Sequence, residues 1–296
     1  MSKIDYKQIK LENERSTHLT KRLNRLSIWG FFKVLYRNEM IKLMLSNLFF
    51  LLFAIPCVFA FVNYTNNVSL LTQTLPSSNA FGIGSAVWLG VGQETTSSML
   101  VIGSKFHLWL TLALCAFAFV FSGGFAVVRD AFWTGKITFF KSFWLGIKSN
   151  LPYTIICTAL LSCMYFGIYV LQNYILTTLP LWAMICILVV AYILLVLLIM
   201  YCLILFSVTN TYKQSVGANL KDAWLLLWMN ILPNFVQLII MALPAGLLAG
   251  FATSFIGSLA IMFFFMIGAF YMVFVWSTHM MRTFALFHPI DPKAKA

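Results

Sequence analysis

The chain has very little charge for its length. Asp, Glu, Lys and Arg make up 9% of its 296 residues, whereas soluble domains usually carry roughly 25%. Hydrophobic residues account for 61% and aromatic residues for 17%. So few charged side chains cannot cover a surface this apolar, which excludes an ordinary soluble protein. The composition predicts an all-α polytopic membrane protein of one domain.

Acidic and basic residues are missing from every long apolar run. We expect six transmembrane helices, at about residues 43–62, 107–128, 152–175, 181–206, 231–250 and 256–280, and none contains Asp, Glu, Lys or Arg. Ion-coupled transporters usually carry an ionisable group inside the membrane. The absence of an ionisable group from the expected spans argues against an ion-coupled transporter.

The usual signatures of catalysis and metal binding are also missing. The six cysteines form no C-x-x-C pair, and the chain has no G-x-S-x-G, H-E-x-x-H or Walker motif. His107 opens an expected span on the outer side and His279 closes one on the inner side, so they do not share a metal. The prediction is a non-enzymatic protein without a cofactor or metal, in which cysteines pack as small residues.

The few charges are unevenly placed along the chain. Of 20 Lys and Arg residues, only Lys105 falls in a segment expected on the outer side. This positive-inside pattern predicts that both termini are cytoplasmic, and it explains the net charge of +12 without nucleic acid. We expect residues 1–26 to be a flexible cytoplasmic tail without a secretory signal, 27–282 the membrane domain, and 283–296 a second tail.

Two segments outside the expected spans differ in composition. Residues 63–106 form the longest polar stretch and are expected to be a loop, in which 81–103 either lies on the outer surface or re-enters the membrane. Pro56 is expected to kink the first span. Residues 26–42 alternate basic and aromatic side chains, which predicts an amphipathic helix in the membrane interface.

The connector between the second and third spans is basic and aromatic. Read as one helix, Trp133, Ile137, Phe140, Trp144 and Ile147 share a narrow face, and lysines flank it. This pattern is typical of a helix lying in the cytoplasmic interface, although a turn at Gly135 would start the helix nearer Thr138. A plain connector without lipid specificity remains the alternative.

The sequence also contains a faint repeat. Lys141, Trp144 and Asn150 recur 80 residues later as Lys221, Trp224 and Asn230. Pro152 and Pro233 follow within one residue of the same offset, and Phe32 and Asn38 echo the unit more faintly. We interpret it as a three-fold parallel repeat of an interfacial helix followed by a hairpin of spans.

Several polar residues allow two interpretations. Asn150, Asn173, Asn230, Gln172 and Gln237 either line a polar cavity or form interhelical hydrogen bonds. Ser122, Gly123 and Gly124 indicate close helix packing. The pair Arg129 and Asp130 either contacts a partner or headgroup, or is an arginine that sets topology beside a solvated carboxylate.

The central run resembles the YesL-type family of bacterial membrane proteins, whose function is unknown. The resemblance rests on Gly123-Gly124, Val128-Arg129, Thr134-Gly135-Lys136 and Lys141-Ser142-Phe143-Trp144 through Asn150. It implies a multi-pass protein of the bacterial cytoplasmic membrane with an accessory role in carbohydrate import. It supplies no catalytic residues.

Two functions follow from these observations as expectations. One is an accessory protein of an ABC-type carbohydrate uptake system, with the bilayer and transporter subunits as partners. The other is a transporter or channel for an uncharged small solute. The residues expected to contact headgroups or partners are Arg129, Trp133, Lys136, Lys141, Trp144, Lys148, Asn150, Lys221, Trp224 and Asn230.

Overall fold

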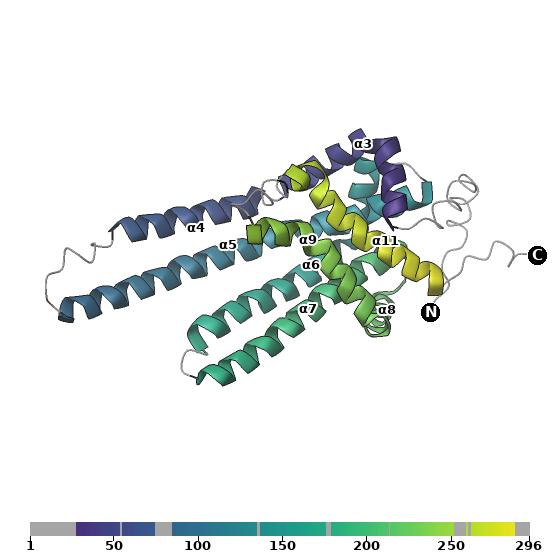
Figure 1. Cartoon of the computed structure of the whole chain (residues 1–296). Coiled ribbons are helices and arrows are strands. Elements are labelled where there is room, and N and C mark those ends of the chain that lie inside the picture. The colour runs from purple at the N-terminus through teal and green to yellow at the C-terminus, as the bar shows by residue number, and fades with distance from the viewer. Residues whose placement is uncertain are drawn as a thin grey trace, which may run out of the picture. The chain divides into compact units, whose positions relative to one another are not determined.

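A computed structural model describes residues 28–53, 55–74, 85–134, 137–175, 179–212, 214–251, 259 and 262–287. These residues are almost entirely helical and contain no β-strand, which confirms the all-α class. The element order is α3 (Ile28–Leu52), α4 (Ile55–Thr74), α5 (Ser85–Thr134), α6 (Phe139–Val170), η2 (Leu171–Ile175), α7 (Leu181–Thr211), α8 (Val216–Met229), α9 (Ile231–Phe251), η4 (Phe264–Gly268) and α11 (Ala269–Phe287) (Figure 1). The predicted flexible tail, 1–26, lies outside the described residues, and of the second predicted tail, 283–296, only 283–287 are described, as the end of α11.

Two helical segments are long and apolar enough to cross a membrane by themselves. They are Phe139–Asn173 and Leu181–Thr211. A third qualifies if Val216–Met229 and Ile231–Pro244 are taken together, although these two helices meet at 90°. The described residues therefore contain two or three candidate spans by length and composition, which is consistent with a membrane protein, and the six expected spans are not confirmed.

The region 63–106 is not the loop that its polarity predicts. Residues 63–74 continue α4, and α5 begins at Ser85 and runs for 50 residues. A helix of that length measures about 75 Å, well beyond the roughly 30 Å of hydrocarbon core. Part of α5 therefore lies outside the core, where Gln, Thr and Ser side chains cost little. Residues 75–84 lie outside the described part of the chain.

The first expected span is interrupted rather than kinked at Pro56. Helix α3 ends at Leu52, and Pro56 is the second residue of α4. Proline is tolerated in the first turn of a helix because its missing N–H has no intrahelical partner there. Pro56 therefore marks the start of a new helix. By contrast, Pro152 lies inside the continuous helix α6.

The chain divides into two compact units. Unit 1 comprises Met1–Leu52, Ala118–Cys157 and Val196–Ala296, and unit 2 comprises Phe53–Phe117 and Thr158–Leu195. In unit 1, α11 packs against both α3 and α9 (Figure 1). The largest fully buried side chains all belong to unit 1 and include Trp276, Phe50, Phe125, Phe143 and Phe270.

Close helix contacts in unit 1 depend on small residues. A Cβ atom on Gly146 would lie 2.5 Å from the Ala126 Cβ, and one on Gly123 would lie 2.5 Å from the Phe143 ring. A Cβ on Gly124 would meet Val273 at 2.7 Å. Helix α5 thus approaches α6 through Gly123 and α11 through Gly124. The packing role predicted for Gly123 and Gly124 is confirmed.

Helix α3 contains a backbone break, and a break of similar geometry directly precedes α9. Glu39 in α3 has φ −134° and ψ 29°, and Asn230 has φ −128° and ψ 34°. Each break follows a basic, aromatic segment and precedes an apolar one. No break occurs at Asn150, where α6 continues to Val170. The first and third repeat units thus share a local feature that the second lacks, and the three-fold repeat is not confirmed.

The glycine contacts can be tested with a matched pair of substitutions on α6. Gly146→Ala is expected to destabilise unit 1 because helices α5 and α6 must separate. Overpacking costs about 1–3 kcal/mol, partly offset by the roughly 1 kcal/mol by which Ala favours a helix. Gly167→Ala is the control, since its Cβ would meet nothing within 4 Å, and it is expected to be neutral or stabilising. Thermal unfolding in detergent measures both; equal effects would contradict the packing role.

Candidate functional site

The structure exposes five of the eight predicted contact residues whose side chains it describes. Lys141, Lys148 and Lys221 are exposed, and Trp144 and Trp224 are 58% and 53% exposed. Arg129 and Asn230 are half-buried, whereas Asn150 is fully buried. The side chain of Trp133 and the whole of Lys136 lie outside the described residues.

The connector residues are divided between two helices. Helix α5 ends at Thr134 and α6 begins at Phe139, so the alternative in which the helix starts near Thr138 is the one observed. Trp133 and Trp144 therefore lie on different helices. On α6, Phe140 and Trp144 are exposed, while Phe143 is buried against Phe50. The exposed aromatic side chains lie beside Lys141 and Lys148 on the same helix.

Helix α8 has one buried face and one exposed face. Asn219, Ala223 and Leu227 are buried at intervals of four residues. On the exposed face the Trp224 and Trp228 rings make an edge contact at 5.6 Å, one turn from Lys221. Indole rings beside an ammonium group suit the headgroup level of a bilayer. The 90° turn into α9 is the geometry expected when a helix lying in the interface precedes a span.

Arg129 and Asp130 are bound into a local network. Nε and Nη2 of Arg129 donate to Asp130 Oδ1 at 3.0 and 2.7 Å, and Nη1 donates to the backbone carbonyl of Asn210. Ser142 donates to the other carboxylate oxygen. A cation at the last carbonyls of a helix is favourable because these groups lack intrahelical partners. The pair therefore ties the ends of α5 and α7 to the start of α6.

Asn150 is an unusual buried residue. Its side chain is fully buried, and neither its amide nitrogen nor its oxygen has a hydrogen-bond partner among the residues that the structure describes. A buried, unsatisfied amide costs about 1–3 kcal/mol. By contrast, Asn234 bonds at both ends, to His279 at 3.0 Å and to the Leu226 carbonyl at 3.3 Å. Asn150 is predicted either to line a polar cavity or to form an interhelical hydrogen bond, and the hydrogen bond is not observed among the described residues.

Substituting leucine for Asn150 and for Asn234 distinguishes an unsatisfied buried amide from a hydrogen-bonded one. Asn150→Leu is expected to raise the free energy of unfolding by about 1–3 kcal/mol, because it removes two unsatisfied polar atoms. Asn234→Leu is expected to lower it by a similar amount, since His279 loses its partner. Thermal unfolding in nanodiscs reports both. A destabilised Asn150→Leu variant would show that its amide makes a bond in the membrane.

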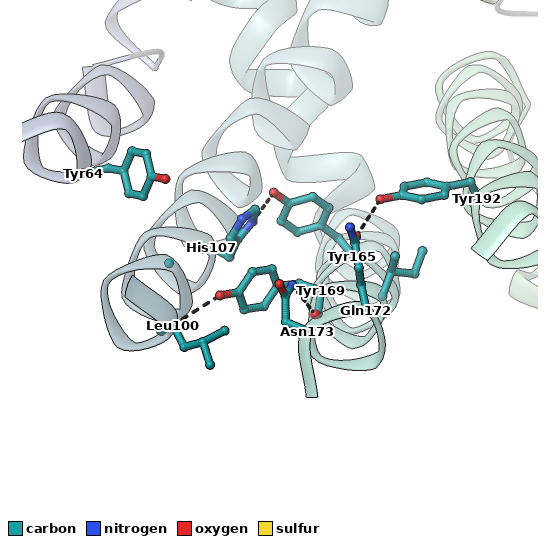
Figure 2. Close-up of a pocket in the computed structure, with 10 residues that line it drawn as sticks. Tyr64, Leu100, His107, Tyr165, Tyr169, Gln172, Asn173 and Tyr192 are labelled. Carbon is teal, nitrogen blue, oxygen red and sulfur yellow. Dashed lines mark hydrogen bonds between the residues drawn. The ribbon is translucent and has the colours of Figure 1, made fainter. Parts of the chain in front are cut away.

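Unit 2 contains a pocket of about 530 Å³. Its lining comprises Tyr64 on α4, Leu100, Gly103 and His107 on α5, Tyr165, Ile168 and Tyr169 on α6, Gln172 and Asn173 on η2, and Tyr192 on α7 (Figure 2). None of these side chains is Asp, Glu, Lys or Arg. The pocket combines aromatic rings with neutral hydrogen-bonding groups.

Contacts among the lining residues hold the polar groups in place. His107 Nδ1 and the Tyr165 hydroxyl lie 2.7 Å apart, and the His107 ring stacks on Tyr169 with centroids 4.0 Å apart. The Tyr192 hydroxyl donates to Gln172 Oε1 at 3.4 Å. Tyr169 lies against Gly103, where a Cβ would be 2.7 Å from its hydroxyl oxygen. These contacts fix the orientation of the lining side chains.

Sequence reasoning identified only part of this pocket. Gln172 and Asn173 were candidates for lining a cavity, and the structure places both there. His107 is predicted only to open a span on the outer side, and the tyrosines are not singled out by the sequence. Tyr165, Tyr169 and Asn173 recur every four residues, which is the signal that could have revealed them. Tyr64 and Tyr192 gave no such signal because they come from other helices.

Comparisons with known proteins found no match to a family model, a curated protein or a solved structure. No group of three or more His, Cys, Asp or Glu side chains able to hold a metal occurs among the described residues. Two regions of the described chain therefore offer sites for binding: the basic aromatic surface of unit 1 and the pocket of unit 2.

Proposed function

We propose that this protein is a non-enzymatic, six-span accessory protein of the bacterial cytoplasmic membrane that binds an ABC-type carbohydrate importer. Both termini are cytoplasmic, and α8 and the start of α6 lie at the inner interface. The observation that carries the proposal is the pairing of exposed lysines with exposed tryptophans on α6 and α8. The resemblance of the central run to YesL-type proteins supplies the kind of partner.

The charges on these helices favour a contact outside the protein. Lys141, Lys148 and Lys221 are exposed, and none forms an ion pair with another residue that the structure describes, whereas Lys42 pairs with Glu39 at 2.7 Å. An unpaired surface lysine is available to an acidic partner or an anionic headgroup. The adjacent Trp144 and Trp224 supply the large apolar contact area that is common at protein interfaces.

Neutralising these lysines tests the accessory role. The triple variant Lys141→Gln, Lys148→Gln, Lys221→Gln is expected to reduce recovery of importer subunits after cross-linking and mild-detergent purification, because complementary charge is lost. Mass spectrometry quantifies the recovered subunits. Lys105→Gln is the control, an exposed lysine on the proposed outer side.

The same preparations also show whether the triple variant keeps its orientation in the membrane. Accessibility of a single introduced cysteine in the C-terminal tail must be the same in the triple variant and the wild type. Undiminished recovery of subunits with unchanged orientation would show that the lysines set topology alone. Recovery of this chain alone from wild-type membranes would contradict the accessory role itself.

A second function is favoured by the unit 2 pocket. A stand-alone conduit for an uncharged solute needs a site that offers hydrogen bonds without charge, and the tyrosine, histidine and amide lining offers them. Proteoliposomes containing only the purified protein are then expected to take up a labelled neutral solute faster than empty vesicles. Uptake equal to that of empty vesicles for every solute tested would exclude the conduit.

A further inference from the structure

The lining of the unit 2 pocket restricts the charge of its ligand. None of the lining residues that the structure describes is Asp, Glu, Lys or Arg, and Lys105, the charged residue of unit 2 whose side chain is described, is exposed. An ion entering such a site would lose hydration without gaining a counter-charge, which is strongly unfavourable. A neutral molecule pays no such penalty.

The hydrogen-bonding groups are numerous and of mixed type. Four tyrosine hydroxyls, one imidazole and two carboxamides border a volume of about 530 Å³. Hydroxyls and carboxamides both donate and accept, so this set matches a ligand whose groups also do both. Hydroxyl groups fit that description, whereas carbonyls or ammonium groups fit only half of it.

The aromatic rings add a complementary apolar surface. Tyr64 extends from α4 toward the His107 side of the pocket, and Tyr165 and Tyr169 reach the same space from α6 (Figure 2). Ring faces pack well against the C–H groups of a saturated ring or chain that carries hydroxyls at its edge. The volume falls within the roughly 300–1,000 Å³ of small-molecule sites.

The backbone near the pocket also departs from regular geometry. Gln172 and Asn173 lie in η2, a π-helical turn that continues α6. Such turns insert an extra residue into the helix and are frequent at functional sites. Here the turn presents two adjacent carboxamides to one cavity. The Gln172 oxygen accepts from Tyr192, and its amide nitrogen carries two further N–H donors.

We propose that this pocket is a binding site for an uncharged polyhydroxylated solute, a sugar or a polyol. Gln172, Asn173 and Tyr165 bind its hydroxyl groups, and Tyr64 and Tyr169 cover its C–H face. The inference rests on the pocket alone and holds whether the protein is an accessory subunit or a conduit.

Saturation-transfer difference NMR on the full-length protein tests this site. The protein is purified in a polyoxyethylene detergent, which has no sugar headgroup, and the probes are sucrose, glucose, sorbitol and choline. Saturable binding of at least one of the three polyhydroxylated probes is expected, with no binding of choline. The absence of saturable binding for all three would overturn the proposal, and so would preferential binding of choline, which would indicate an aromatic cage for cations.

Variants assign the binding to the pocket. The double variant Tyr165→Phe, Gln172→Leu is expected to weaken the Kd about tenfold, because two hydrogen-bonding groups are lost. Tyr201→Phe is the control, since this tyrosine does not line the pocket. If the double variant fails to give a monodisperse protein, Gly103→Ala replaces it, because its Cβ displaces the Tyr169 hydroxyl. An unchanged Kd in a folded pocket variant would overturn the assignment.

Discussion

The close approach of α5 to α6 and α11 is the constraint on which unit 1 depends. Gly123, Gly124 and Gly146 leave room for the Phe143 ring, Val273 and Ala126 where a larger residue would collide. Between helices in a membrane, hydrophobic driving force is weak because lipid tails are as apolar as the side chains. Van der Waals contact at short distance must replace it, and only small residues permit that distance. The buried cluster around Phe50 and Phe143 forms as a consequence.

Polar groups then define how these helices end and meet. Arg129 and Asp130 bind Asn210 and Ser142, so the last carbonyls of α7 are tied to α5 and to the start of α6. Asn234 links α9 to α11 through His279. These bonds are directional, whereas the surrounding packing is not. Asn150 lacks such bonds, which makes it the exception among the buried asparagines that the structure describes.

The two regions of proposed function differ in the chemistry that they offer. The surface of unit 1 presents charge and indole rings, which suit a macromolecular partner or a headgroup. The pocket of unit 2 presents neutral donors and acceptors among aromatic rings, which suits a small hydroxylated molecule. An accessory protein of a carbohydrate importer would use the unit 1 surface to bind its partner and the unit 2 pocket to bind the solute. The physical basis of each is independent of the other.

The sequence by itself determined the membrane class, the helical fold and the small-residue contact at Gly123 and Gly124, because these follow from composition and local spacing. It also identified Gln172 and Asn173 as residues suited to a cavity. It could not locate the break before Pro56 or recognise 63–106 as helical, because polar residues form helices when tertiary contacts support them. Only the tertiary structure brought Tyr64, His107, Tyr169 and Tyr192 together, since they come from four helices whose mutual packing no local pattern encodes.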